Sequence, residues 1–205
     1  MINYSNITRY ENMDAKDYFA LYSAEDKYYS HSFLKREQSG QSPYLEITEK
    51  IKLGAMADNI LTSPDTVNPA LTEFRAGRNI ASRIKQHPVI GPLIPKFVPQ
   101  VSYTGQIAYK GLVMNVCGRL DWEIPKICAI DLKVTAAKTN DEFAKLITYM
   151  GYDNQMFNYM GLSGTKAAFI IPYSTKTNAC LRVIKFEWGI GVNKFWENSV
   201  IKFGK

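Results

Sequence analysis

The stretch from Gly118 to Val134, GRLDWEIPKICAIDLKV, is the part of the sequence that says most about the fold. Its two apolar runs are separated by Pro125-Lys126, so the pattern predicts two strands joined as a hairpin. With a three-residue loop at 125–127, Asp121 and Asp131 lie opposite each other, with Cβ atoms about 4.5–5.5 Å apart. A two-residue loop would shift the register by one residue and separate them.

Asp131 and Lys133 are two residues apart in the second strand, so their side chains lie on the same face of the sheet. Two facing carboxylates on apolar strands repel each other, and a divalent cation removes that cost. Mg²⁺ takes oxygen ligands, commonly one or two carboxylates with water and a substrate phosphate. With Lys133 placed to hold or deprotonate a water, these are the parts needed for metal-assisted hydrolysis of a phosphodiester. The alternative is a surface strand with an ordinary Asp–Lys ion pair.

A helix is predicted downstream, because residues 139–142, TNDE, have the spacing of a capping box. We expect this helix to continue until Gly161 and Gly164 end it. Gln155 and Tyr159 are four residues apart and share a face with Tyr152, opposite the apolar side of the helix. This polar and aromatic face is either part of a site or a set of ordinary exposed residues.

The other segments complete an α/β pattern. They are expected to be helices at 42–63 (opened by Ser42-Pro43), 72–85 and 192–203, an extended connection at 88–99, and strands at 98–104, 108–122, 167–171 and 180–186, with Gly105 in the first turn. Together they predict a single α/β domain, residues 1–205, with a central mixed sheet flanked by helices. Residues 1–97 would form a mainly helical N-terminal part, and residues 98–205 the sheet-containing catalytic core.

Composition excludes several classes of protein. The chain has 205 residues, of which 46% are hydrophobic and 21% charged, a globular balance. No apolar run reaches the ~18 residues of a membrane span and the N-terminus lacks the features of a signal peptide, so we expect a cytoplasmic protein without a membrane partner. The net charge of +6 is compatible with a nucleic-acid partner. With three cysteines, no CxxC pair and two histidines, any metal must be held by oxygen.

The order G-R-x-D, D-x-K, Q-x-x-x-Y resembles the PD-(D/E)XK nuclease superfamily. Its RecB-type exonucleases are the most similar group, including the exodeoxyribonuclease VIII and lambda exonuclease branch of phages and prophages. Upstream, residues 30–35, SHSFLK, resemble the S-x-S-x-L-K entry helix of the exodeoxyribonuclease VIII-like group. Residues 53–58, LGAMAD, resemble its l-G-x-x-x-H helix.

The resemblance implies a role for each residue that matches a motif. Asp121 and Asp131 would bind the metal together with the carbonyl of Leu132, and Lys133 would be the catalytic lysine. Gln155 and Tyr159 would brace the active site and the DNA end, and the DNA contacts would include Arg75, Arg78, Tyr152, Ser32 and Lys35. For the arginines, the alternative is a solvated helix face.

Two positions depart from the family pattern. Asp58 stands where family members commonly carry histidine, and Gln100 stands near the place of a glutamate. Asp58 can still bind a cation through oxygen, so we expect it to be a further metal ligand. Gln100 supplies no negative charge, which weakens that position.

The resemblance implies an exonuclease that depends on Mg²⁺, with Mn²⁺ as a substitute, and degrades the ends of duplex DNA in the 5′→3′ direction for phage or prophage recombination. A single-strand annealing protein would be its partner, and a homo-oligomer is a further expectation. The alternatives are a structure-specific or site-cutting endonuclease of the same fold, and a catalytically inactive nuclease-fold module that binds DNA.

Overall fold

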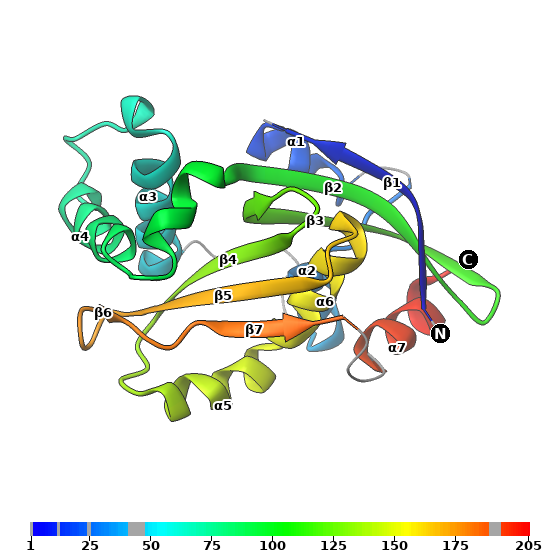
Figure 1. Cartoon of the computed structure of the whole chain (residues 1–205). Coiled ribbons are helices and arrows are strands. Elements are labelled where there is room, and N and C mark those ends of the chain that lie inside the picture. The colour runs from blue at the N-terminus through cyan, green and yellow to red at the C-terminus, as the bar shows by residue number, and fades with distance from the viewer. Residues whose placement is uncertain (1, 12, 24–25, 41–47, 189–193) are drawn as a thin grey trace.

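One mixed sheet of seven strands forms the centre of the computed structural model, which describes residues 2–11, 13–23, 26–40, 48–188 and 194–205 (Figure 1). The strand order is β1-β2-β3-β4-β5-β6, and β7 also pairs with β5. Strands β1 to β4 are antiparallel neighbours, whereas β4 and β5 run parallel. The strands are β1 (Asn3–Tyr10), β2 (Val98–Tyr109), β3 (Leu112–Ile124), β4 (Cys128–Thr135), β5 (Ala167–Ser174), β6 (Ala179–Cys180) and β7 (Ile184–Glu187).

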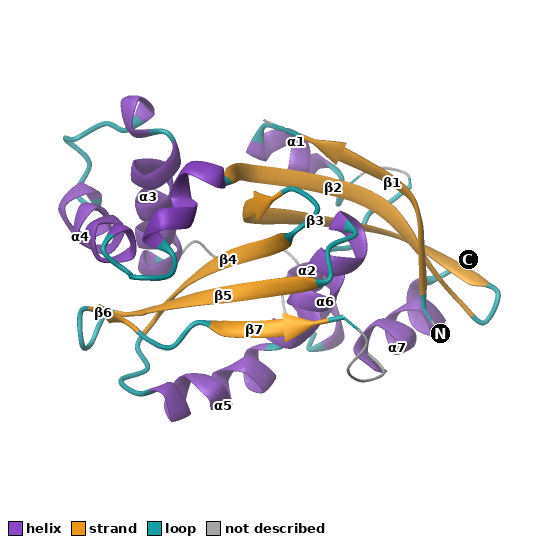
Figure 2. Ribbon diagram, viewed as in Figure 1, coloured by secondary structure: helices purple, strands orange, loops and turns teal. Residues whose placement is uncertain are grey.

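Helices lie against the sheet (Figure 2). Two separate apolar clusters join them to it. The helices are α1 (Ala15–Ala20), α2 (His31–Gln38), α3 (Glu49–Thr62), α4 (Phe74–Lys85), α5 (Asn140–Met150), α6 (Tyr152–Ser163) and α7 (Lys194–Phe203), with the 3-10 turns η1 (Pro64–Thr66) and η2 (Gly91–Lys96). One cluster joins the sheet to α6 and α7, for example through Met156 and Trp196. The other joins it to α3 and α4, for example through Leu61 and Ile84. The expected α/β fold with a central mixed sheet is therefore confirmed. None of the described helices has the length and apolar character needed to cross a membrane.

The register of the central hairpin agrees with the prediction. Trp122 pairs with Ile130 and Ile124 with Cys128, as a three-residue loop requires. The expected turn at Gly105 is wrong, because β2 continues through it and turns at Lys110-Gly111, both with positive φ. A Cβ atom at Gly105 would lie 2.9 Å from Leu162 of α6, so this glycine allows a helix to pack closely on the strand.

The N-terminal part is less helical than expected. Residues 3–10 form β1, which pairs with β2, instead of a helix. The third helix begins at Glu49 with Thr48 as its cap, while Ser42-Pro43 lies outside the described residues. The connection at 88–99, expected to be extended, contains the 3-10 turn η2, because the fixed φ of proline suits such a turn.

The long helix predicted after residue 139 is two helices. Gly151 adopts a left-handed conformation with φ of 70°, which ends α5 and begins α6. Thr139 caps α5 as predicted and accepts a hydrogen bond from the Glu142 backbone N–H at 3.1 Å. Of the two glycines expected to end the helix, Gly161 lies inside α6, whereas Gly164 follows Ser163 as its C-cap with φ of 67°. The C-terminal strand predicted at 180–186 is also divided, into β6 and β7, both antiparallel to β5.

Gly161 and Gly54 are both helix-interior glycines, and they should respond in opposite ways to alanine. A Cβ atom at Gly161 would lie 2.3 Å from the ring of Tyr4, whereas at Gly54 it would meet only Val134, at 3.6 Å. Gly54→Ala should therefore raise the free energy of unfolding by about 0.5–1 kcal/mol through helix propensity. Gly161→Ala should lower it by about 1–3 kcal/mol through overpacking. Urea unfolding of both variants measures the difference, and equal effects would contradict the packing of β1 on α6.

Candidate active site

The candidate site lies where β3 and β4 stop pairing. Their ladder runs from Ile124↔Cys128 to Trp122↔Ile130, and Asp121 and Asp131 are the next residues on the two strands. Farther along β3, its edge is bonded instead to Tyr29, which donates to the Asn115 carbonyl and accepts from the Cys117 N–H, each at 3.1 Å. The two strands therefore separate at the carboxylates, and the segment that leads into α2 occupies the freed edge of β3.

The two carboxylates are neighbours in a largely buried place. Asp131 is only 2% exposed, and its Oδ2 forms an ion pair with Lys133. Asp121 Oδ2 accepts a hydrogen bond from the Leu132 backbone N–H at 2.8 Å. Burial, and then the negative charge of Asp131, raise the pKa of Asp121 well above its usual value. The proximity predicted from the hairpin register is thus present.

Lys133 is a positive charge held between the carboxylates and an aromatic ring. Its Nζ lies 5.0 Å from the centre of the Tyr152 ring, so α6 reaches the site through its first residue. Burial by itself would lower the pKa of Lys133, but Asp131, Tyr152 and Asp121 raise it, and the pKa lies above its usual value. A lysine that remains protonated is suited to neutralising charge on a phosphate and is poorly suited to accepting a proton from water.

Tyr159 belongs to the core, contrary to the expected polar face opposite the apolar side of the helix. It is 6% exposed and packs in the cluster between α6 and the sheet. Its hydroxyl donates to the Arg119 carbonyl and accepts from Gln155 Nε2, each at 2.7 Å. A Cβ atom at Gly118 would lie 3.1 Å from the Tyr159 ring, so the glycine of the G-R-x-D motif makes room for this contact. Tyr159 therefore fixes α6 on the backbone of β3 just before Asp121.

Asp58 reaches the same region from α3 and is 3% exposed. Its two oxygens accept hydrogen bonds from the side chains of Trp122 and Gln100. Gln100 in turn accepts from Arg119 Nε at 2.8 Å. Burial raises the pKa of Asp58 to about 6, although the bonds from Trp122 and Gln100 act in the opposite direction. Its expected role as a metal ligand is a prediction that these contacts do not test.

Arg119 and Trp122 are site residues that sequence reasoning did not assign. Arg119 lies inside the quoted G-R-x-D motif, and that was the available signal. Trp122 could not be found from strand alternation, because the alternation breaks. Leu120 packs in the cluster on the α6 side, whereas Trp122, two residues later, packs in the cluster of α3 and α4. Across the ladder from this break, Gln100 has a φ of 51°, a positive value that only a few per cent of non-glycine residues adopt.

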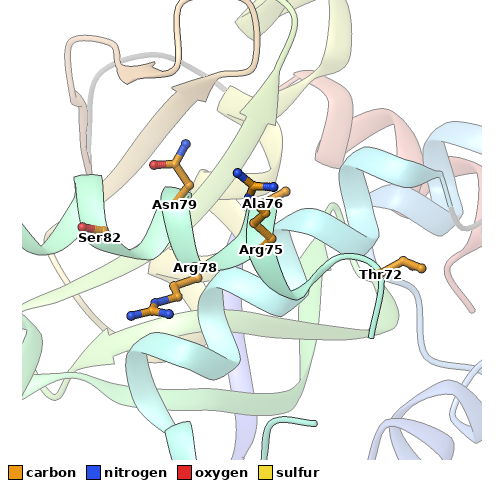
Figure 3. A pocket seen from close by; sticks show the side chains of 6 residues that line it. All are labelled: Thr72, Arg75, Ala76, Arg78, Asn79 and Ser82. Atoms are coloured by element: carbon orange, nitrogen blue, oxygen red, sulfur yellow. The ribbon is translucent and has the colours of Figure 1, made fainter. Parts of the chain in front are cut away.

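The predicted DNA contacts lie in two places. Arg75 and Arg78 are exposed on α4 and line a surface hollow, whose six lining residues Figure 3 shows: Thr72, Arg75, Ala76, Arg78, Asn79 and Ser82. Ser32 and Lys35 lie on α2, where Lys35 Nζ donates to the Tyr149 carbonyl at the end of α5 at 3.0 Å. Of the predicted DNA contacts, Tyr152 has a direct interaction with the core motif, through Lys133.

The Asp121–Asp131 pair fits a divalent cation by its chemistry. One Asp131 oxygen is buried with the Lys133 ammonium as its ion-pair partner, and the two negative charges of Asp121 and Asp131 repel each other. Such a pair, with a backbone carbonyl such as that of Leu132, is the kind of oxygen donor set that Mg²⁺ takes in proteins. In the part of the chain that the structure describes, no three histidine, cysteine, aspartate or glutamate side chains form a group able to hold a metal together.

Tyr159→Phe should destabilise the protein, since it removes only the hydroxyl that joins α6 to β3. The Arg119 carbonyl and the Gln155 amide would then lose their partner. We expect the free energy of unfolding to fall by about 1–3 kcal/mol, the cost of leaving a buried polar group unsatisfied. Tyr149→Phe is the matched control, because Tyr149 is 77% exposed and should change stability by less than about 0.5 kcal/mol. Similar urea midpoints for both variants would contradict the bracing role of Tyr159.

Asp121→Asn should stabilise the metal-free protein at neutral pH. Because the pKa of Asp121 is raised by folding, wild-type stability should fall as pH rises from about 4 through that raised pKa. Asparagine keeps an acceptor for the Leu132 N–H and removes the charge, so the stability of the variant should not fall with pH on account of this residue. Chemical unfolding of both proteins in chelator, at about pH 5 and about pH 8, measures the free energy of unfolding at the two pH values.

Added metal should reverse the order of stability of the two proteins. A hundredfold excess of Mn²⁺ over its dissociation constant should stabilise the wild type by about 2.7 kcal/mol and Asp121→Asn much less. Asp65→Asn, an exposed aspartate in η1, is the control. If neither pH nor metal distinguishes Asp121→Asn from Asp65→Asn, the two carboxylates are not coupled.

No family model and no curated protein sequence matches this chain. Among solved structures, a candidate exonuclease from Eubacterium rectale is similar with a TM-score of 0.59 and 18% identity, covering 94% of this chain and 82% of that chain. A phage-related exonuclease from Haemophilus somnus 129PT has a TM-score of 0.38 and 14% identity, covering 82% and 84%. The first likeness shows that the chain has an exonuclease-like α/β fold, the fold that the resemblance to the PD-(D/E)XK superfamily implies.

Proposed function

We propose that this protein is a metal-dependent deoxyribonuclease that hydrolyses phosphodiester bonds at the ends of duplex DNA. The observation that carries the proposal is the juxtaposition of Asp121, Asp131 and Lys133 where β3 and β4 separate. Two carboxylates for a cation and a lysine for a phosphate are the groups that metal-assisted phosphodiester hydrolysis requires. The exonuclease-like fold of the chain supports the same reaction class.

Each residue of the site has a distinct role in this proposal. Asp121, Asp131 and the carbonyl of Leu132 would hold Mg²⁺ or Mn²⁺, which when bound supplies a Lewis acid to the phosphodiester. Lys133, kept protonated by its acidic neighbours, would neutralise charge on the phosphate. Gln155 and Tyr159 would keep the β3 backbone in place, so that the carboxylate of Asp121 meets the substrate in a fixed position.

The surface supports a polyanionic substrate. The net charge is +6, and Arg75 and Arg78 line an exposed hollow on α4 where they could contact phosphates without reading sequence. Ser32, Lys35 and Tyr152 would contact DNA nearer to the carboxylates. The 5′→3′ direction, the role in phage or prophage recombination, the annealing partner, the homo-oligomer and a cytoplasmic location belong to this proposal through the family resemblance.

Cleavage of linear and covalently closed duplex DNA tests the proposal. An exonuclease should degrade end-labelled linear duplex in Mg²⁺ or Mn²⁺, leave the closed circle intact and stop in chelator. Cleavage of the closed circle would instead identify the endonuclease alternative. Absence of metal-dependent cleavage of either DNA would identify the inactive DNA-binding alternative, for which the neutral Gln100 is the supporting observation.

Asp131→Asn should abolish cleavage and leave DNA binding nearly intact. The change removes one negative charge at the cation position and preserves the shape of the side chain. Binding that depends on lysine and arginine should persist and should weaken steeply with salt. Turnover on linear duplex and binding to the same duplex at two salt concentrations measure both effects, with the exposed Asp65→Asn as control. Wild-type turnover of Asp131→Asn would remove the assignment of the site.

A further inference from the structure

Asp58 accepts hydrogen bonds from two side chains near Asp121, one on the same strand as Asp121 and one on the neighbouring strand. Trp122, the residue after Asp121, donates through its indole N–H to one Asp58 oxygen. Gln100 donates through its amide to the other. In the β2–β3 ladder, Pro99 pairs with Trp122 and Val101 with Leu120, so Gln100 falls opposite Asp121. Asp58 therefore connects α3 to both strands at the position of Asp121.

The orientation of the Gln100 amide follows from its two partners. Arg119 Nε can donate a hydrogen bond but cannot accept one, and it lies 2.8 Å from Gln100 Oε1. The oxygen of the Gln100 amide must therefore face Arg119. The NH₂ group then faces Asp58, which as a carboxylate can only accept. The chain Arg119–Gln100–Asp58–Trp122 thus satisfies donor and acceptor at every step, and a glutamate at position 100 could not complete it.

This arrangement bears on how many cations the site can take. Both Asp58 oxygens accept hydrogen bonds from protein side chains, which leaves them less available to a cation. Within the described residues, Asp58 does not join Asp121 and Asp131 in a group able to hold a metal. The residue that faces Asp58 is Gln100, an uncharged amide, and not the second carboxylate that another cation would need.

We propose that Asp58 is a positioning residue, which fixes Gln100 and Trp122 around Asp121, and that the site binds a single divalent cation at Asp121 and Asp131. The inference rests on the proposed metal-dependent function and departs from the expectation that Asp58 is itself a ligand. A residue that acts on a metal site through its neighbours changes the affinity of the site, whereas a ligand of a second cation changes the number of cations bound.

Mn²⁺ titration of the full chain without DNA distinguishes these roles, with free Mn²⁺ followed by electron paramagnetic resonance. The wild type should bind one Mn²⁺ per chain. Asp58→Asn should still bind one, about 10–100-fold more weakly, as is typical when a group that supports a ligand is removed. Two Mn²⁺ in the wild type, with one lost in Asp58→Asn, would overturn the inference and leave the proposed nuclease function standing. No Mn²⁺ at all would overturn both.

A swapped pair tests the positioning role directly. The new amide in Asp58→Asn would direct an NH₂ group at the NH₂ group of Gln100, so this change alone should lose affinity. When this change is combined with Gln100→Glu, the amide at position 58 donates and the carboxylate at position 100 accepts, the reverse of the wild-type bond. The same carboxylate can also accept from Arg119. We expect the double variant to recover most of the Mn²⁺ affinity and of the melting temperature lost by each single change, still with one Mn²⁺ bound. A double variant that is no better than the single variants would overturn the positioning role.

Discussion

The repulsion between the carboxylates of Asp121 and Asp131 is the constraint on which the site depends. The structure meets part of it within the protein, through the Leu132 N–H that binds Asp121 and the ion pair between Lys133 and Asp131. The remainder appears as the raised pKa of Asp121. A buried pair that is only partly neutralised is unfavourable in an apolar sheet, and it becomes intelligible as a place for a cation.

The separation of β3 and β4 lies at the same carboxylates. Beyond Trp122 and Ile130 the ladder ends, and the Leu132 N–H donates to the Asp121 carboxylate. Because the strands part there, β3 needs other partners. Tyr29 bonds its backbone on the free edge, and the Tyr159 hydroxyl binds the Arg119 carbonyl. Tyr29 and Tyr159 therefore form hydrogen bonds with the part of β3 that is not paired with β4.

Sequence reasoning succeeded where short-range geometry decides the outcome. A three-residue loop fixed the register of Asp121 and Asp131, and a spacing of four residues placed Gln155 beside Tyr159. It failed where a distant partner decides. Gly161 is typical of a helix end, yet it lies within α6, where the absence of a Cβ atom makes room for the Tyr4 ring of β1. Strand β1 itself is stabilised by pairing with β2, about a hundred residues later, which no local pattern reveals.

The network around Asp58 shows most clearly what local patterns omit. Compared with the family pattern, histidine is replaced by Asp58 and glutamate by Gln100, and taken one at a time each change weakens the site. In the structure the two residues bond to each other, so the changes are a single exchange. Compared with the family that the sequence resembles, the carboxylate of this pair lies on the helix and a neutral amide lies on the strand. After burial and Asp131, the negative charge of Asp58 also raises the pKa of Asp121, so the neutral Gln100 avoids adding a further carboxylate to a repulsion that the site already has to balance.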